Sequence, residues 1–312
     1  MTSPLRAPAA AGAQPEAPAR SSAAASWLVA AGQTARPRQW PKNLLVFAAP
    51  LAGATMGRDD GLGYALAAAA AFVAASAAVY YVNDVIDAGR DRLHPVKRAR
   101  PVASGRLPAA HALMLAGLSA AAAVSLGFWI GEPRLGALIT GYLVLSLLYA
   151  LALKHVPVVE LLFVATGFVF RALGGAVATH VPPSGWFLLV CSLGALLVAV
   201  AKRFTELAML GSQAARHRPV MRWYRLSWLR LGQRLVTAVM IVAYLLWALG
   251  EGNGWMRAWH LASAIPLAAA LTRFDWLAGR ADGRPVEDLI SRDGPMACCE
   301  LGWLVMFTVG LW

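Results

Sequence analysis

Three aspartates stand close together near residue 90, at spacings that could bind a metal ion. Asp84, Asp87 and Asp91 are placed at i, i+3 and i+7, which brings their carboxylates to one face of a helix. Carboxylates this close repel one another unless cations lie between them. Oxygen ligands suit Mg²⁺, which commonly takes one or two carboxylates together with phosphate oxygens and water. The spacing predicts a Mg²⁺ site, and the alternative is a solvated acidic helix end paired with Arg90 and Arg92.

A basic segment follows these aspartates. Lys97, Arg98 and Arg100 would supply the charge needed to neutralise a diphosphate carried by a bound Mg²⁺. The alternative is that they only anchor the chain at the cytoplasmic face of a membrane. His94 precedes a proline, and we expect it to form loop hydrogen bonds rather than to act in catalysis.

Polar residues also stand at the edges of other apolar stretches. Lys42 and Asn43 lead into the first of these stretches, where Trp40 could simply anchor an interfacial segment. Tyr149 and Lys154 close a later stretch. We expect these groups to lie on the same side of the membrane as the three aspartates.

An acid and a base occur within one further apolar stretch. Glu160 is near its start, and Arg171 lies about three helical turns deeper. A charged side chain at that depth needs a partner and favours a polar cavity or pathway. Lys202, Arg203 and Glu206 close the next stretch. Lys202 and Glu206 have the i, i+4 spacing, so they could also form an ordinary helix ion pair worth only about 0.2–0.5 kcal/mol.

The composition is that of a membrane protein. The 312 residues are 59% apolar and 14% charged, with a mean hydropathy of +0.56. Soluble domains average about 45–50% apolar and about 25% charged residues, and a disordered chain has fewer apolar residues still. Apolar stretches able to cross a membrane occupy residues 41–57, 62–84, 108–130, 134–153, 157–179, 185–201, 235–250, 258–272 and 296–312. The expected fold is all-α, with about nine transmembrane helices around a cytoplasm-facing polar cavity.

Small residues and cysteines add two expectations about packing. Alanine-rich runs and the pair Gly174–Gly175 favour close contact between helices in lipid. Cys191, Cys298 and Cys299 lie in apolar runs without metal-ligand spacing. We therefore expect neither a disulfide scaffold nor a zinc site.

The basic residues are distributed unevenly along the chain. There are 28 Lys and Arg against 16 Asp and Glu, and 24 of the 28 fall on the side that carries the N-terminus. This asymmetry predicts an integral plasma (inner) membrane protein with its N-terminus and its polar site on the cytoplasmic side. The lipid bilayer is then the expected partner. Nucleic acid is not, because the basic loops are too short to form a recognition fold.

The chain divides into a tail and one membrane domain. Residues 1–26 consist mostly of Ala, Pro, Ser and Gly, and we expect a disordered tail there. No apolar core follows Arg6, so a secretory signal is not expected. Residues 27–312 form the expected transmembrane domain, and the sequence is compatible with a homo-oligomer.

Taken together, the motifs resemble the UbiA-type intramembrane prenyltransferase superfamily. The N-D-x-x-D-x-x-x-D helix end at 83–91, followed by R-P and S-G in a loop, carries this resemblance. Further motifs are similar to its decaprenyl-phosphate phosphoribosyltransferase branch. These are R-P-x-Q-W-x-K-N at 36–43, H-P-x-K-R-x-R-P-x-A-S-G at 94–105, Y-x-x-x-L-K at 149–154, G-F-x-x-R-A at 167–172 and K-R-x-x-E at 202–206. The resemblance covers residues 36 to about 293.

This resemblance implies a glycosyltransferase with Mg²⁺ as its cofactor. The implied reaction moves a 5-phosphoribosyl group from 5-phosphoribosyl 1-diphosphate to a polyprenyl phosphate and releases diphosphate. Catalytic roles fall on Lys42 and on Asp84, Asp87 and Asp91, which would hold the metal. The implied substrate-binding residues are Asn43, Tyr81, Asn83, Lys97, Arg98, Arg100, Tyr149, Lys154, Glu160, Arg171, Lys202, Arg203 and Glu206. Residues 27–312 would then be the transferase domain.

Two departures and two alternatives accompany this resemblance. Glu160 stands where the family pattern has an aspartate. The second acidic motif of aromatic prenyltransferases is absent, since residues 202–234 are mainly basic. Prenyl transfer from an allylic diphosphate by the same fold is the first alternative. An ion-coupled transporter is the second, and it predicts paired broken helices in two repeated halves, for which the sequence gives no convincing repeat.

Overall fold

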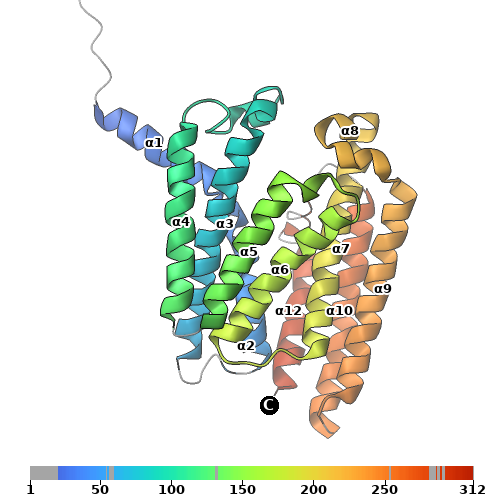
Figure 1. Ribbon diagram of the computed structural model, residues 1–312. Helices are drawn as coiled ribbons and strands as arrows, with labels where there is room; N and C mark the ends of the chain where they lie inside the picture. The colour runs from blue at the N-terminus through green and yellow to red at the C-terminus, as the bar shows by residue number, and fades with distance from the viewer. Residues whose placement is uncertain are drawn as a thin grey trace, which may run out of the picture.

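Every regular element in the described part of the chain is a helix, which confirms the all-α class. The computed structural model describes residues 20–53, 55, 60–130, 133–252, 254–280, 286, 289 and 292–311. The α-helices are α1 (Arg20–Thr34), α2 (Ala48–Ala52), α3 (Gly61–Arg92), α4 (Ala109–Trp129), α5 (Pro133–Leu151), α6 (Val159–Ala178), α7 (Gly185–Leu210), α8 (Ala214–His217), α9 (Leu226–Gly250), α10 (Gly254–Arg280) and α12 (Gly294–Val309) (Figure 1). Short 3₁₀ segments join them: η1 (Pro37–Phe47), η2 (Lys97–Ala99), η3 (Leu153–His155), η4 (Gly211–Gln213) and η5 (Pro219–Trp223).

Six of the described helices are long and apolar enough to cross a membrane. They are α3, α4, α5, α6, α9 and the stretch 185–213 that contains α7. Helix α10 has 27 residues, and α12 is apolar but has only 16. Each expected range from 62–84 onward overlaps one helix, but the number of about nine transmembrane helices is not confirmed.

The N-terminal part differs from the expected continuous span at 41–57. Instead, the 11-residue η1 contains Pro41 and is followed by the five-residue α2. Proline removes a backbone donor and restricts the residue before it, so a regular α-helix does not continue through this segment. Helix α1 begins at Arg20, within the tail expected at 1–26. Residues 1–19 lie outside the described residues, and their disorder stays a prediction.

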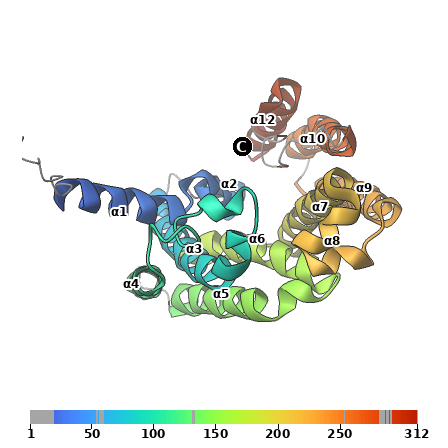
Figure 2. The same ribbon diagram turned by 90° about the horizontal axis from the view of Figure 1, so that it is seen from above.

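The helices are arranged in an open curve. Helix α3 packs on α4, α7 packs on α9, and α10 packs on α12. Seen from above, the curve runs from α4 and α3 through α5 and α6 to α7, α9, α10 and α12 (Figure 2). The C-terminal end of α3 and the connections from α5 to α6 and from α7 to α9 all lie at the same end, uppermost in Figure 1. The predicted site residues at these helix ends are therefore brought to one end of the molecule.

The expected close contact at Gly174–Gly175 is confirmed. A Cβ atom on Gly174 would lie 2.2 Å from the Phe72 ring, and one on Gly175 would lie 1.7 Å from the backbone oxygen of Val46. The missing side chains let η1 and α3 press directly against α6. Val46 and Phe72 are fully buried there in a core shared with α5. This contact fixes η1, which carries Lys42 and Asn43, against the bundle.

Substitution of Gly175 tests this packing. Gly175→Ala places a methyl group onto backbone rather than onto a flexible side chain, and we expect a loss of about 1–3 kcal/mol in the free energy of unfolding. Thermal denaturation of the purified protein in detergent measures the loss. Gly117→Ala in α4 is the control, because nothing lies within 4 Å of its added Cβ. Equal melting temperatures for the two variants would contradict the close approach.

Candidate active site

The predicted metal ligands lie in the last turns of α3, where two of them are buried and share a cation. Asp84 is 2% exposed and Asp91 4% exposed. Nη1 of Arg100 lies 2.7 Å from Oδ2 of Asp91 and 3.4 Å from Oδ1 of Asp84. Arg36 forms a second ion pair with Asp84. Cations of the chain itself therefore offset the repulsion between these carboxylates.

Arg36 is a site residue that the sequence analysis does not single out. It lies between α1 and η1 with a φ of 53°, a left-handed conformation that is uncommon outside glycine. Its guanidinium carbon lies 4.9 Å from the centre of the Tyr80 ring on α3. The turn thus directs Arg36 onto the acidic end of α3. Its only signal in the sequence is that it begins the motif at 36–43.

The end of α5 connects the α3 aspartates with a second charged cluster. Nζ of Lys154, in η3, lies 2.9 Å from Oδ1 of Asp87. Tyr149 stacks on Phe163 with ring centres 6.4 Å apart, and its hydroxyl accepts a hydrogen bond of 3.4 Å from Arg218. The structure thus connects Lys154 of η3 with the α3 aspartates and Tyr149 of α5 with Arg218.

Glu160 is the centre of the second cluster. It is fully buried at the start of α6, where the helix dipole favours a carboxylate. Arg203 binds it through two hydrogen bonds, from Nε to Oε1 at 2.6 Å and from Nη2 to Oε2 at 2.8 Å. Arg218 adds a third at 2.9 Å. Two guanidinium groups, those of Arg203 and Arg218, therefore bind the one carboxylate of Glu160.

Glu206 and Tyr224 complete this second cluster. Arg203 also donates to Oε2 of Glu206 at 2.8 Å, while Lys202 beside it is exposed. The Tyr224 hydroxyl accepts from the backbone N–H of Val158 at 3.0 Å and lies 3.4 Å from Oε1 of Glu160. Burial raises the pKa of Tyr224, so the phenol keeps its proton and donates to this carboxylate.

Arg218 and Tyr224 are also absent from the sequence-based set of site residues. Both lie in the connection between α7 and α9, a segment that we interpreted only as basic loop. A basic loop is expected on topological grounds alone, so Arg218 carried no distinct signal. Tyr224 gave no signal in the sequence. Its hydroxyl accepts from the N–H of Val158, and the position of that N–H depends on the left-handed turn there, where φ is 63°.

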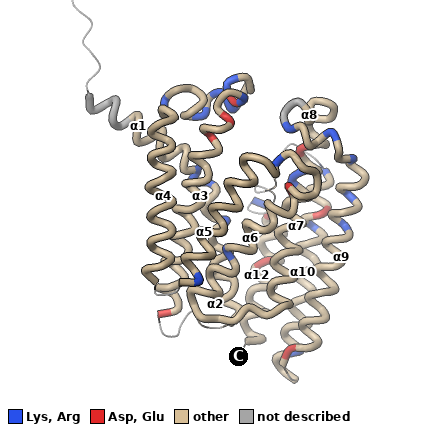
Figure 3. Tube along the Cα trace, in the orientation of Figure 1, with Lys and Arg blue, Asp and Glu red and all other residues tan. Residues whose placement is uncertain are grey.

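The region between the clusters has a positive electrostatic field. Partial burial lowers the pKa of His155, and the neighbouring cations Lys154, Arg90 and Arg218 lower it further. The imidazole therefore stays neutral at neutral pH. Figure 3 shows Lys and Arg gathered around this end of the bundle, with a few acidic residues among them. Such an arrangement attracts phosphate groups.

Arg171 and Asn43 form a separate polar centre inside the bundle. Arg171 is 6% exposed. Its guanidinium donates to Oδ1 of Asn43 at 2.7 Å, the carbonyl of Gly167 at 2.6 Å, Oγ of Ser76 at 2.8 Å and the hydroxyl of Tyr142 at 3.1 Å. These bonds join η1 to α3, α5 and α6. The contacts indicate a positioning role for Arg171 and Asn43, whereas the resemblance implies substrate contact.

The remaining predicted site residues take different positions. Tyr81 is buried and donates to the backbone oxygen of Ala31 at 3.0 Å, so it holds α1 on α3. Lys42, Asn83 and Lys97 are half-buried, and Arg98 is exposed.

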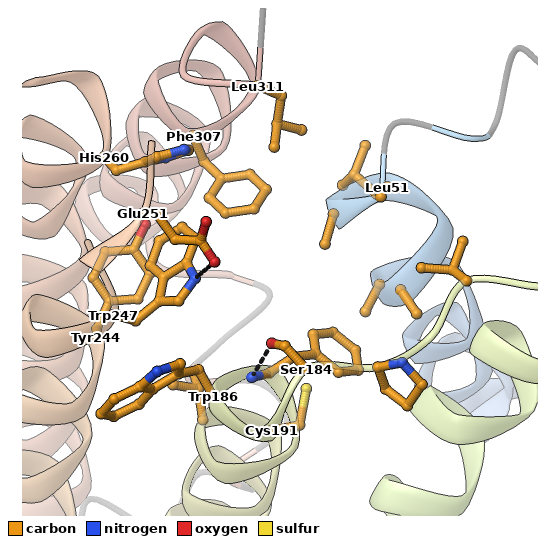
Figure 4. Close-up of a pocket in the computed structure, with 18 of the residues that line it drawn as sticks. Leu51, Ser184, Trp186, Cys191, Tyr244, Trp247, Glu251, His260, Phe307 and Leu311 are labelled. Carbon is orange, nitrogen blue, oxygen red and sulfur yellow. Dashed lines mark hydrogen bonds between the residues drawn. The ribbon is translucent and has the colours of Figure 1, made fainter. Parts of the chain in front are cut away.

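An apolar cavity of about 470 Å³ lies at the opposite end of the molecule. It opens between α2, α7, α9, α10 and α12, and Figure 4 shows aromatic side chains on its wall. Tyr244, Trp247, Trp303 and Phe307 are among the residues that line it. Nε1 of Trp247 donates to Oε1 of Glu251 at 3.0 Å. A cavity of this kind suits an apolar chain better than a phosphate.

The donor set at the end of α3 fits Mg²⁺ chemically. Asp84 and Asp91 both contact one nitrogen of Arg100, so their oxygens are within reach of a common cation. All three aspartates offer the oxygen ligands that Mg²⁺ prefers. Among the described residues, however, no group of three or more His, Cys, Asp or Glu side chains is close enough to hold a metal ion together. Substrate oxygens would have to complete the coordination.

A helical bundle with an acidic helix end facing a cationic cluster defines a class of intramembrane transferases, and the comparisons agree. The chain belongs to the UbiA prenyltransferase family, whose model matches residues 43–286. It is 36% identical to a decaprenyl-phosphate phosphoribosyltransferase of Mycolicibacterium smegmatis, over 86% of this chain and 88% of the relative. A protein of the same name from Mycobacterium tuberculosis H37Rv is 38% identical, over 88% of this chain and 91% of the relative.

Solved structures show the same fold at low sequence identity. A UbiA homolog from Archaeoglobus fulgidus bound to DMAPP and Mg²⁺ has a TM-score of 0.69 and 15% identity, over 92% of this chain and 98% of that chain. A digeranylgeranylglyceryl phosphate synthase has a TM-score of 0.67, also at 15% identity, over 91% and 98%. The superfamily resemblance found in the sequence is confirmed.

Substitution of Glu160 tests the second cluster. Glu160→Gln removes the fully buried carboxylate that Arg203 binds through two hydrogen bonds, and breaking a buried ion pair in this way costs about 3–5 kcal/mol. Thermal denaturation without substrates measures the effect. Glu206→Gln is the matched control, because the Glu206 side chain is 28% exposed and shares Arg203 with Glu160. Similar small losses in both variants would show that Glu160 does not organise the cluster.

Proposed function

We propose that this protein transfers a 5-phosphoribosyl group from 5-phosphoribosyl 1-diphosphate to a polyprenyl phosphate. The observation that carries the proposal is the second cluster, where Arg203 and Arg218 surround Glu160. Guanidinium groups are well suited to bind the phosphate groups of two phosphorylated substrates. The relatives named decaprenyl-phosphate phosphoribosyltransferase, 31–38% identical over most of the chain, support the same reaction.

The reaction requires no strong base. An oxygen of the polyprenyl phosphate forms a bond to C1 of the ribose as the bond from C1 to the diphosphate oxygen breaks. Phosphate monoesters are already anionic at neutral pH, since their second pKa is about 6. The site must instead neutralise the departing diphosphate, position the two substrates and exclude water.

The α3 aspartates and their cationic partners would meet the diphosphate. Asp84, Asp87 and Asp91 would hold Mg²⁺, which when bound stabilises charge on the leaving diphosphate. Arg100 and Lys154, which contact these aspartates, would turn to phosphate oxygens. Such an exchange keeps every charge at the end of α3 paired before and after the substrate binds.

Basic residues farther from the aspartates would take the other phosphates. Lys42, Lys97 and Lys202 would contact these phosphates, and Arg203 is fixed by its two carboxylate partners. Arg171 would act through Asn43 by holding η1, and with it Lys42, in place. Glu160 would orient Arg203 and Arg218, with a reach one methylene longer than the aspartate of the family pattern.

The lipid substrate would extend from the charged end toward the apolar cavity. Its phosphate would stay among the cations, and its isoprenoid chain would reach the aromatic wall around Trp247 and Phe307. The distribution of Lys and Arg favours the cytoplasm for the charged end and for the N-terminus (Figure 3). The donor would then enter from water, while the acceptor would enter sideways from the bilayer.

Neutralising one metal ligand tests the proposed chemistry. Asp84→Asn and Asp87→Asn should each lower the transfer rate at least about 100-fold, because charge on the leaving group is no longer stabilised. Transfer is measured with labelled 5-phosphoribosyl 1-diphosphate and polyprenyl phosphate. Asp60→Asn, just before the other end of α3, is the control and should retain activity. Normal turnover of both test variants would remove the metal assignment.

The choice of donor separates the proposal from prenyl transfer. The purified protein is offered labelled 5-phosphoribosyl 1-diphosphate or a labelled allylic prenyl diphosphate, each with Mg²⁺, and the lipid products are resolved by thin-layer chromatography. We expect label in lipid only from the phosphoribosyl donor, and none after chelation of Mg²⁺. Label from the prenyl donor alone would establish the alternative.

A further inference from the structure

A second, smaller cavity lies between α9 and α10, away from the two charged clusters. Its volume is about 260 Å³, which would hold a lipid headgroup but not a whole lipid. It is lined by Arg234, Thr237, Ala238 and Ile241 on α9 and by Thr272 and Asp275 on α10. Arg234 lies about 12 Å below the start of α9, and Asp275 about 8 Å below the end of α10. Both helix termini are at the charged end of the molecule (Figure 1).

The polar atoms of this cavity are incompletely satisfied within the described part of the chain. Thr237 is 6% exposed, yet its hydroxyl has no hydrogen-bond partner there. Oδ1 of Asp275 is likewise buried without a partner, while Oδ2 lies 3.0 Å from Arg230. Leaving a buried polar atom unpaired costs about 1–3 kcal/mol. A ligand at this position would remove that cost.

The unsatisfied atoms define the ligand's chemistry. Arg234 is an exposed residue that lines the cavity, and together with the Thr237 hydroxyl it can donate to an anionic oxygen. Asp275 Oδ1 needs a hydrogen-bond donor. The Thr272 hydroxyl already donates to the Ala268 carbonyl at 2.8 Å, so its oxygen also accepts. The complementary ligand joins an anionic phosphodiester to an N–H donor.

The surface beside the cavity suits lipid chains. An exposed apolar stripe runs down α9 through Leu231, Leu235, Val239, Val242, Leu246 and Leu249, each 50–57% exposed. On α10, Trp276 lies between Arg273 and Arg280, whose guanidinium carbons are 5.5 Å and 4.6 Å from ring centres. Tryptophan with flanking arginines is typical of the level at which headgroups lie. Acyl chains on the stripe would place their headgroup near the cavity.

We infer that this cavity binds the headgroup of an aminophospholipid of the phosphatidylethanolamine type. The phosphate contacts Arg234 and the Thr237 hydroxyl, and the ammonium group contacts Asp275 and the Thr272 oxygen. Phosphatidylcholine has the same phosphate but no N–H group, so it cannot satisfy Asp275. The site therefore discriminates between two lipids of similar size and equal net charge. The inference does not depend on the proposed reaction.

Lipid retention tests the inference. The full-length protein is equilibrated with vesicles containing equal amounts of phosphatidylethanolamine and phosphatidylcholine, extracted gently and analysed by native mass spectrometry. We expect the wild-type protein to retain phosphatidylethanolamine about fivefold more than phosphatidylcholine, as one added hydrogen bond of about 1 kcal/mol implies. Thr237→Val preserves the side-chain shape and should weaken retention of both lipids, as should Arg234→Gln.

The matched control is Arg222→Gln, since Arg222 is exposed at the same end of the molecule but does not line the cavity. This variant should keep the wild-type retention and preference. Equal retention of the two lipids by the wild-type protein would overturn the inference. Unchanged retention in Thr237→Val and Arg234→Gln would overturn it as well. A loss of oligomeric mass in these variants, with lipid retention unchanged, would assign the cavity to contact with a second copy of the chain instead.

Discussion

The pairing of acids with bases at one end of the bundle is the interaction on which the site depends. Each α3 aspartate contacts a cation that comes from another segment: Arg36 before η1, Arg100 after α3 and Lys154 after α5. Glu160 does the same for Arg203 and Arg218. Because buried charges are costly without partners, each of these pairs holds together the two segments that carry it. The same charges are available to a metal ion and to phosphate groups.

A scaffold of hydrogen bonds and close backbone contact holds this charged end in place. Arg171 ties η1 to α3, α5 and α6 through four hydrogen bonds, and Gly175 lets the backbone of η1 touch α6. Both contacts lie below the site in the apolar interior. They explain why a segment broken by Pro41 can still position Lys42. Rigidity beneath the site is what a reaction without a strong base needs, since catalysis there depends on placement and charge.

The all-α class and the positions of most long helices could be predicted from the sequence, because a membrane helix is specified locally by a long apolar run. The i, i+3, i+7 aspartates needed only helical periodicity. The sequence could not distinguish Arg36 and Arg218 from basic residues that only set the orientation in the membrane. Their acidic partners, Asp84 and Glu160, are 48 and 58 residues away along the chain. The role of Arg171 was also hidden: its depth indicated a polar partner, but not that Ser76 and Tyr142 would supply it.

The central claim is that a divalent cation and a diphosphate enter the charged end together and replace the pairs within the chain. Equilibrium binding of labelled 5-phosphoribosyl 1-diphosphate to the purified protein, with and without saturating Mg²⁺, tests it most directly. The account predicts binding at least about tenfold tighter with the metal, a coupling of about 1.4 kcal/mol. Equal affinity under the two conditions would contradict it.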